Sequence, residues 1–302
     1  MVKNSMNCPS LIIGGAPKSG TTALYYYLMQ HPGFFLSEKK ELHFFSRPLL
    51  ERTIAGPGDR YILAEIPKNF EEYLSYFNRC GKNQISVDIS PSYLIFPEAA
   101  DNIFRQLPDA RIVFLLRNPA DKAFSQYLHL LGTGREHLSF KEALKTEDIR
   151  QLKGYAAIWH YRKSGFYAQI LEHYLRVFGR ESVKIFYYEE FHSDPARVLN
   201  EICDFVGTEQ GFNFEPVTDI NRSGAPRSAL VAKLFLAPNS FSYLLRRVVP
   251  ISLGRTVRKF LKERNTGAKP VLSDELRLSL LADFRDDILR VEQLVGRPSG
   301  WI

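Results

Sequence analysis

The chain has 302 residues, of which 45% are hydrophobic and 24% are charged, and its 40 Lys and Arg outnumber its 33 Asp and Glu. These values are ordinary for a globular protein and exclude disordered, collagen-like and low-complexity classes. The three cysteines, Cys8, Cys80 and Cys203, are far apart and form no CxxC pair, so neither a disulfide scaffold nor a zinc ribbon is expected.

Short apolar runs alternate with longer amphipathic stretches, which predicts that strands alternate with helices. The predicted strands are Ser10–Gly14, Ile85–Asp88, Arg111–Leu116 and Val183–Tyr187. The predicted helices are Thr22–Gln30, Pro119–Leu131, Phe166–Phe178, Pro195–Val206 and Ser273–Val295. Loops are expected over Phe45–Asn69, Gly132–His137 and Pro216–Ser228. This order is typical of an α/β fold, here one domain over residues 1–302 with a central, mainly parallel sheet flanked by helices.

The apolar stretches are too short for membrane insertion. No uncharged apolar run approaches the roughly 20 residues of a membrane-spanning helix. The apolar part near the start, Leu11–Ile13, is too short for the core of a signal peptide. We therefore expect a cytoplasmic protein, which also suits the unpaired cysteines.

The sharpest local pattern is the segment Gly14–Thr22, which joins the first predicted strand to the first predicted helix. A Gly-rich turn at such a junction directs backbone N–H groups and the positive end of the helix dipole at an anion. Gly15 and Gly20 have the spacing of a Walker A loop, and Thr22 falls at its Ser/Thr position. The segment therefore predicts a phosphate-binding loop.

Two departures argue against a metal-bound triphosphate. Thr21 stands where a triphosphate-binding loop carries lysine, and the lysine of this loop, Lys18, lies inside it. A strand that ends in an acid usually holds Mg²⁺ in such proteins, but the strand Arg111–Leu116 is followed by Arg117. The pattern thus favours a site that binds phosphate directly, through a guanidinium.

Together these motifs resemble the sulfotransferases that use 3′-phosphoadenosine 5′-phosphosulfate (PAPS). The letters PKSGTTAL after a strand are similar to their loop for the 5′-phosphosulfate, and FLLRNPADKAFSQY is similar to their 3′-phosphate motif. KKELHFFS and the terminal GRPSGW match as well, so the resemblance covers essentially the whole chain and points to bacterial enzymes and glycan (heparan sulfate) sulfotransferase domains. It implies a P-loop-containing α/β domain that takes PAPS as sulfuryl donor and needs no metal.

The resemblance also implies roles for individual residues. The 5′-phosphosulfate loop comprises Lys18, Ser19, Gly20, Thr21 and Thr22, and the 3′-phosphate contacts are Arg117 and Ser125. A looser alignment over Asn221–Ser228 adds Arg222, Ser223, Gly224 and Arg227 as a loop that closes over the 3′-phosphate and adenine. The alternative for this last segment is an ordinary surface loop.

The acceptor hydroxyl or amine must lose a proton as it attacks sulfur, so the site needs a base. Glu41 and His43 are two residues apart, and in an extended segment this spacing places both side chains on one face. The resemblance implies that Glu41 is the catalytic base and that His43 lines the same site. The alternative makes Glu41 a surface carboxylate paired with Lys39 or Lys40, and His43 a core histidine.

One stretch departs from the family pattern. In the glycan sulfotransferases a Glu-Lys pair precedes a Thr-Pro-x-Tyr stretch, and its lysine assists at the sulfate. The matching stretch here is Asp88–Tyr93, with Ile89 in place of that lysine. Either Lys18 alone neutralises the leaving phosphate, or the acceptor site differs from the glycan enzymes. Asp88 either positions the acceptor or caps a strand end.

Positive charge is concentrated between Ala225 and Pro270, where ten Lys and Arg stand against one acid, Glu263. Such a segment is typical of a contact with an anionic partner or of a solvated helical face. Its basic residues are interleaved with apolar ones, which suits peripheral contact with an anionic surface, and no nucleic acid is expected.

These features predict a sulfotransferase that moves a sulfuryl group from PAPS, by in-line transfer, to a small-molecule, lipid-like or glycan acceptor. Two alternatives stay open at this point. One is a P-loop kinase that acts on a small molecule and uses ATP with Mg²⁺. The other is a nucleotide- or nucleic-acid-binding module that uses the basic segment 225–270, whose binding would fall steeply with salt.

Overall fold

The structure is a computed structural model that describes residues 8–217, 228, 231, 264–265, 267–268 and 270–302. Its strands are β1 (Leu11–Gly15), β2 (Phe34–Leu36), β3 (Ile85–Ile89), β4 (Arg111–Leu116) and β5 (Val183–Tyr187). They form one sheet in the order β2-β3-β1-β4-β5, and every neighbouring pair is parallel. The predicted α/β fold with a parallel central sheet is therefore confirmed.

Helices cover both faces of this sheet. The α-helices are α1 (Thr21–Leu28), α2 (Arg47–Leu50), α3 (Phe70–Ser75), α4 (Glu98–Gln106), α5 (Pro119–Gly132), α6 (Phe140–Lys145), α7 (Glu147–Leu152), α8 (Ala168–Phe178), α9 (Tyr188–Ser193), α10 (Pro195–Val206) and α14 (Asp274–Val295). The 3₁₀ turns are η1 (Phe44–Ser46), η2 (Asp59–Glu65), η3 (Pro91–Leu94), η4 (Ala157–Trp159), η5 (Lys163–Gly165) and η6 (Arg180–Ser182). Within the described residues, no helix is long and apolar enough to cross a membrane.

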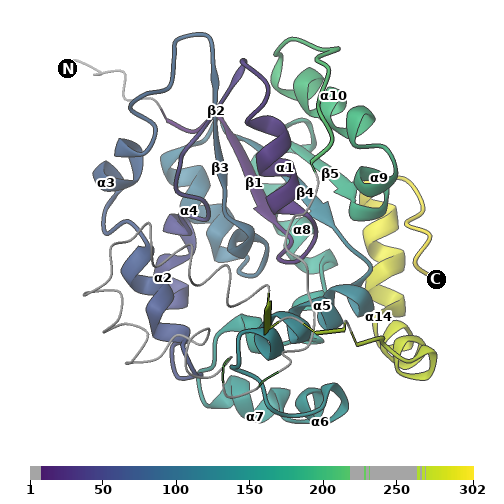
Figure 1. Ribbon diagram of the computed structural model, residues 1–302. Helices are drawn as coiled ribbons and strands as arrows, with labels where there is room; N and C mark the ends of the chain where they lie inside the picture. The colour runs from purple at the N-terminus through teal and green to yellow at the C-terminus, as the bar shows by residue number, and fades with distance from the viewer. Residues whose placement is uncertain (1–7, 218–227, 229–230, 232–263, 266, 269) are drawn as a thin grey trace.

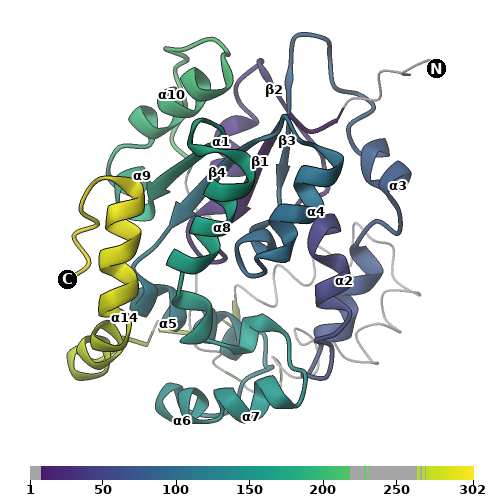
Figure 2. The same cartoon turned by 180° about the vertical axis from the view of Figure 1, so that it is seen from behind.

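Alternate residues of the central strand β1 face opposite sides of the sheet and build two separate cores. Leu11 and Ile13 pack with residues of α1 and α10, which lie in front of the sheet in Figure 1. Ile12 packs with residues of α4, α8, α5 and α14, and Figure 2 shows α4 and α8 covering this other face. All three side chains are fully buried, as expected of a central parallel strand.

Every predicted strand and helix is present, with ends that differ by at most two residues. The expectation of an irregular Phe45–Asn69 was wrong, because this stretch contains η1, α2 and η2. Sequence reasoning also missed β2, α3, α4, α6, α7 and α9, which span only three to nine residues. Elements this short show too few turns or alternations for periodicity to detect. One of them carried a readable signal, since Ser139 and Glu142 form the capping box that starts α6.

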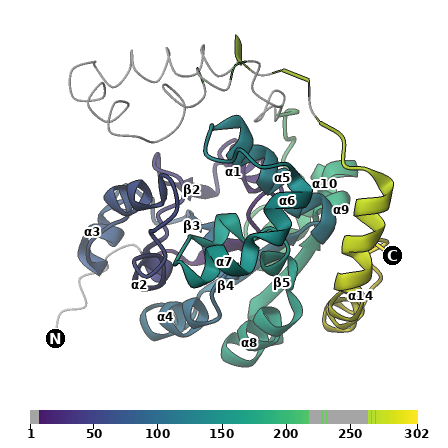
Figure 3. The same ribbon diagram turned by 90° about the horizontal axis from the view of Figure 1, so that it is seen from below.

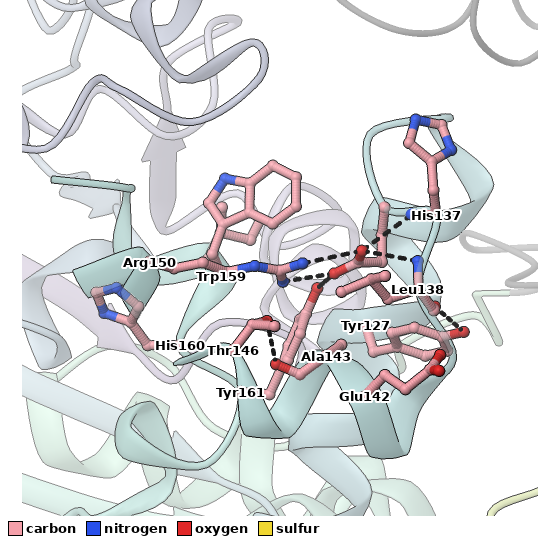
Figure 4. Close-up of polar contacts among 12 residues, drawn as sticks. Tyr127, His137, Leu138, Glu142, Ala143, Thr146, Arg150, Trp159, His160 and Tyr161 are labelled. Carbon is pink, nitrogen blue, oxygen red and sulfur yellow. Dashed lines mark hydrogen bonds and ion pairs between the residues drawn. The ribbon is translucent and has the colours of Figure 1, made fainter. Parts of the chain in front are cut away.

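A buried ionic cluster fixes α6 and α7, which lie with α5 below the sheet (Figures 1 and 3). The carboxylate of Glu136 accepts two hydrogen bonds from Arg150, at 2.5 and 3.0 Å, and one from the Tyr161 hydroxyl at 2.7 Å. The backbone N–H groups of His137 and Leu138 also donate to it (Figure 4). Burial alone would raise the pKa of Glu136, but these hydrogen bonds outweigh it and hold the pKa below its usual range.

Removing the charge of Glu136 should destabilise the fold, because it leaves the buried guanidinium of Arg150 without a counter-ion. We expect Glu136→Gln to lower the free energy of unfolding by about 3 kcal/mol in urea denaturation. The control is Glu51→Gln, since the Glu51 side chain is 47% exposed and pairs with Arg47 on the surface. That variant should lose at most about 0.5 kcal/mol. Equal losses in the two variants would contradict the structural role of the buried cluster.

Candidate active site

The strand order makes the connections diverge at the carboxyl ends of the central strands. From β1 the chain goes to β2 and β3 on one side of the sheet, and then to β4 and β5 on the other. In open parallel sheets ligands bind at this point, where the connections diverge. The segments that follow β1, β3 and β4 contain Lys18, Ser90 and Arg117, so the topology brings three separate sequence motifs to one edge.

The predicted phosphate loop turns tightly between β1 and α1. It is anchored where the Ala16 N–H donates to the carbonyl of Leu115 at 2.8 Å. Gly20 caps α1 with a φ of 88°, so the first N–H groups of the helix face the loop. Ser19 is fully buried, and among the described residues its hydroxyl has no hydrogen-bond partner. A buried orphan hydroxyl is costly unless water or a ligand satisfies it, which makes this loop a candidate binding site.

Arg117 lies against the same loop. Its Nη1 donates to the carbonyl of Lys18 at 3.1 Å, and its guanidinium lies 4.8 Å from the ring centre of Tyr188. The Tyr167 hydroxyl donates to the Arg117 carbonyl at 3.0 Å, which fixes the backbone. Ser125 lies half-buried on α5, and no side-chain hydrogen bond joins it to Arg117 or to the loop within the described residues. The geometry therefore brings Arg117 and Lys18 together, and the 3′-phosphate contact expected of Ser125 stays a prediction.

Glu41 and His43 are held at the end of β3. The Glu41 N–H donates to the Ile89 carbonyl at 3.1 Å, and the His43 N–H donates to the Ser90 hydroxyl at 2.9 Å. The expected extended backbone was wrong, because both residues have a positive φ, 59° for Glu41 and 53° for His43. The bonds to β3 impose this conformation. The two side chains nevertheless meet as expected, with His43 Nε2 3.7 Å from Glu41 Oε2.

Lys18 shares this unusual backbone, with a φ of 68°. Among the described residues, Lys18, Glu41 and His43 are the non-glycine residues with a positive φ. Such conformations cost of order 1–3 kcal/mol each and persist where surrounding structure enforces them, often at functional sites. The three residues proposed for catalysis from the sequence thus coincide with the three strained positions.

Two serine hydroxyls orient the ring of His43 on the side away from Glu41. His43 is buried, and its Nδ1 lies 2.7 Å from the Ser92 hydroxyl, which in turn lies 2.6 Å from the Ser46 hydroxyl. These contacts turn Nε2 toward Glu41. The lysines considered as partners of Glu41 bond elsewhere, since Lys39 lies near Glu65 and Lys40 donates to Thr22.

The electrostatic surroundings keep Glu41 ionised. Burial on its own would raise the pKa of this carboxyl, but the hydrogen bond and charge of His43 and the charges of Lys40 and Lys18 outweigh it and lower the pKa to about 2. The side chain is nevertheless 44% exposed, so an acceptor can reach it. Glu41 is therefore an accessible carboxylate that can accept a proton at neutral pH.

Asp88 caps a strand end. It is buried, its Oδ2 accepts hydrogen bonds from the Tyr73 and Tyr93 hydroxyls at 2.9 and 2.8 Å, and its Oδ1 accepts one from Ser90 at 2.7 Å. Burial raises its pKa despite these bonds. Of the two readings of this residue, the contacts favour the structural cap over a role in positioning the acceptor.

Sequence reasoning missed several residues that complete the site. The Lys40 ammonium donates to the Thr22 hydroxyl at 2.9 Å, and its place directly before Glu41 was the available signal. Near the chain end, the Trp301 indole donates to Glu189, whose other oxygen accepts from the backbone of Asn118, next to Arg117. The GRPSGW motif therefore buttresses the junction that carries Arg117.

Some expectations fall outside the described residues. Arg222, Ser223, Gly224 and Arg227 belong to this group, as does most of the basic segment 225–270. Within the ranges that the structure describes, no group of three or more His, Cys, Asp or Glu could hold a metal ion.

Comparisons with known proteins give a consistent picture. A family model described as "Sulfotransferase family" matches residues 9–212. Human heparan sulfate glucosamine 3-O-sulfotransferase 6 is 30% identical over 207 residues, which cover 67% of this chain and 53% of that protein. Mouse bifunctional heparan sulfate N-deacetylase/N-sulfotransferase 4 is 27% identical over 231 residues, 70% of this chain and 24% of that protein. The matched part of this chain thus spans about half the length of the human relative and about a quarter of the length of the mouse relative.

A solved structure matches over nearly the full length. The crystal structure of a sulfotransferase from Alicyclobacillus acidocaldarius superposes with a TM-score of 0.76 and 32% sequence identity. The match covers 97% of this chain and 98% of that one.

Gly20→Ala should destabilise the protein by more than the cost of placing alanine at a positive φ. A Cβ at Gly20 would lie 3.0 Å from the Tyr188 ring, the ring that Arg117 contacts, whereas a Cβ at Gly207 would meet nothing within 4 Å. Both glycines have a positive φ, 88° and 72°, so both variants lose about 1–2 kcal/mol from backbone strain. We expect Gly20→Ala to lose more than Gly207→Ala in urea denaturation. A smaller loss at Gly20 would contradict the close packing of the loop on Tyr188.

Proposed function

This chain belongs to the sulfotransferase family, and we propose that it moves a sulfuryl group from PAPS to a hydroxyl or amine of an acceptor. The observation that carries the proposal is the meeting of three motifs at one sheet edge. The phosphate loop with Lys18, the carboxylate of Glu41 and the guanidinium of Arg117 come from segments after three different strands. An anion-binding loop beside an accessible base is what transfer from an anionic donor to a protonated nucleophile requires.

The residues of the loop fit a nucleotide with phosphate groups. The buried, unpartnered hydroxyl of Ser19 and the free N–H groups at the start of α1 suit an anion. We propose that Lys18, Ser19, Gly20, Thr21 and Thr22 hold the 5′ end of PAPS. Arg117 and Ser125, with Arg222, Ser223, Gly224 and Arg227, are proposed for its 3′-phosphate and adenine. When bound, PAPS supplies the sulfuryl group and a bisphosphate leaving group.

The roles of the protein side chains follow from their contacts. Glu41 accepts the proton of the attacking hydroxyl or amine, as its exposure and ionised state allow. His43, oriented by Ser92, keeps the Glu41 carboxylate in place. Lys18 stabilises the negative charge that develops on the leaving phosphate. Because these groups are positioned before substrate arrives, little reorganisation is needed during transfer.

The acceptor class is proposed from the relatives. Their names assign them to heparan sulfate, a glycan with both hydroxyl and amine positions. We propose a glycan as the first acceptor to test, ahead of a lipid-like or small-molecule alcohol. The family membership does not favour the kinase or the nucleic-acid-binding module.

Ligand-induced thermal shifts distinguish these readings. We expect adenosine 3′,5′-bisphosphate (PAP), the product of PAPS, to stabilise the wild type by about 2.7 kcal/mol at a hundred times its Kd. This is a rise of several degrees in Tm. Lys18→Ala should lose the shift, and ATP with Mg²⁺ should give none. A shift with ATP and Mg²⁺ alone would favour the kinase and overturn the proposal.

The role of Glu41 is tested by removing its charge. We expect Glu41→Gln to lower kcat by about 10²-fold or more while PAP affinity stays within about twofold. Glu38→Gln is the matched control, because Glu38 lies in the same segment but pairs with Arg79 on the surface, with side chains 85% and 76% exposed. It should keep wild-type activity. Full activity of Glu41→Gln would exclude Glu41 as the base.

The pKa of Glu41 gives a pH prediction. In the free site nearby positive charges lower it to about 2, and a bound polyanion offsets those charges and so raises it. Activity needs the ionised carboxylate, so it falls as pH drops through this pKa. At saturating PAPS, kcat/KM for acceptor reports the pKa of Glu41 in the complex with PAPS, whereas kcat/KM for PAPS reports it in the free enzyme. We therefore expect kcat/KM for acceptor to fall on the acid side at a higher pH than kcat/KM for PAPS does. PAP binding to Glu41→Gln over the same range corrects for titration of the nucleotide. A fall of both at the same pH would contradict the coupling.

A further inference from the structure

Lys40 connects the segment that carries the base with the phosphate loop. It directly precedes Glu41, yet its Nζ donates to Thr22 Oγ1, in the first turn of α1, at 2.9 Å. Its ammonium also lies 5.3 Å from the ring centre of Tyr25, on the same helix. The side chain of Lys40 thus links the segment after β2 to α1, the helix that follows β1.

The charge of Lys40 is not neutralised by a carboxylate in contact. Among the described residues, no Asp or Glu oxygen lies within 4 Å of its Nζ, and its partners are a hydroxyl and an aromatic ring. Burial lowers the pKa of Lys40, although the charge of Glu41 acts in the opposite sense. Its neighbour Lys39 differs, because it lies 3.9 Å from the carboxylate of Glu65. A half-buried ammonium with only neutral contacts is suited to binding an anion.

The position between loop and base specifies which anion. In-line transfer requires the attacking atom, the sulfur and the leaving oxygen to lie in a row, with the base at one end and the phosphate loop at the other. Lys40 is the residue that joins these two ends. The end of β3 contributes Ile89 here, which carries no charge, so Lys40 provides a second ammonium beside Lys18, in addition to the guanidinium of Arg117.

We propose that Lys40 is a catalytic residue whose ammonium donates hydrogen bonds to the oxygens of the transferring sulfuryl group. The inference rests on the proposed function. During transfer a bond forms between sulfur and the acceptor atom, and the bond from sulfur to the 5′-phosphate oxygen breaks with its electron pair left on that oxygen. The acceptor proton goes to Glu41, and Lys40 keeps its own proton throughout.

PAP lacks the sulfuryl group, so a residue that contacts only this group should not affect PAP binding. A measurement of PAP affinity therefore distinguishes Lys40 from the residues that hold the nucleotide. We expect Lys40→Gln to keep PAP affinity within about twofold, measured by titration calorimetry. The same variant should lower kcat by about 10²-fold, the usual effect of removing one donor to developing charge. Lys18→Ala should weaken PAP binding instead. Activity is followed as conversion of PAPS to PAP, with a glucosamine-containing polysaccharide as acceptor and with water alone.

A second readout uses binding without turnover. In a Glu41→Gln background PAPS survives the titration, so its affinity can be compared with that of PAP. Adding Lys40→Gln should weaken PAPS about tenfold and leave PAP unchanged, whereas a purely structural role would weaken both equally. Lys40→Arg should restore part of both the affinity and the rate, since it retains the charge.

The control is Lys39→Gln, which removes the same charge one residue away and should leave kcat and both affinities unchanged. Lys40→Met, which retains the apolar stem against Tyr25, checks that any loss reflects the ammonium and not the packing. Equal losses of PAP and PAPS affinity in Lys40→Gln, or an unchanged kcat, would overturn the proposal. Failure of the wild type to bind either nucleotide would instead overturn the proposed function itself.

Discussion

The carboxylate of Asp88 ties the base of the candidate site to the central sheet. Ser90 donates to Asp88 at 2.7 Å and accepts the N–H of His43 at 2.9 Å, so one hydroxyl connects the buried acid with the strained segment around Glu41. The aromatic hydroxyls of Tyr73 and Tyr93 fix the same carboxylate from α3 and η3. Because a buried carboxylate needs these donors, the segment has little freedom to relax into an ordinary backbone conformation. The placement of the base depends on this arrangement.

The sequence was sufficient to predict the features that depend on residues close together in the chain. The phosphate loop was readable because a glycine-rich turn between an apolar run and a helix has a recognisable spacing, and the long helix α14 because several turns repeat its pattern. The role of Lys40 was not readable, and for Asp88 the sequence left two roles open, a strand-end cap and a contact with the acceptor. The donors to Asp88 come from residues 73, 90 and 93, and the partner of Lys40 lies eighteen positions earlier at Thr22. The bonds from Tyr73 to Asp88 and from Lys40 to Thr22 span 15 and 18 positions, so they form only in the folded chain and no short pattern encodes them.

The electrostatics of the site bear on the proposed role of Glu41, in which a carboxyl of low pKa serves as the base. Two ammonium groups, Lys18 and Lys40, and the ring of His43 act on Glu41 in the absence of nucleotide and hold its pKa near 2. In the proposed function, a bound polyanion would offset these charges and so raise the pKa of Glu41. Under that proposal, Glu41 would accept a proton most readily in the complex with the donor, where transfer is productive. The groups that lower the pKa of Glu41 are His43, Lys40 and Lys18, and the nearby Ile89 adds no charge to them.

The left-handed backbone at Lys18 has a consequence for selection in the laboratory. Glycine adopts a φ of 68° without the steric cost that lysine incurs, so Lys18→Gly relieves strain in the loop at the expense of its charge. Selection only for resistance to heat or protease would therefore favour loss of the lysine to which we assign a role in the proposed function.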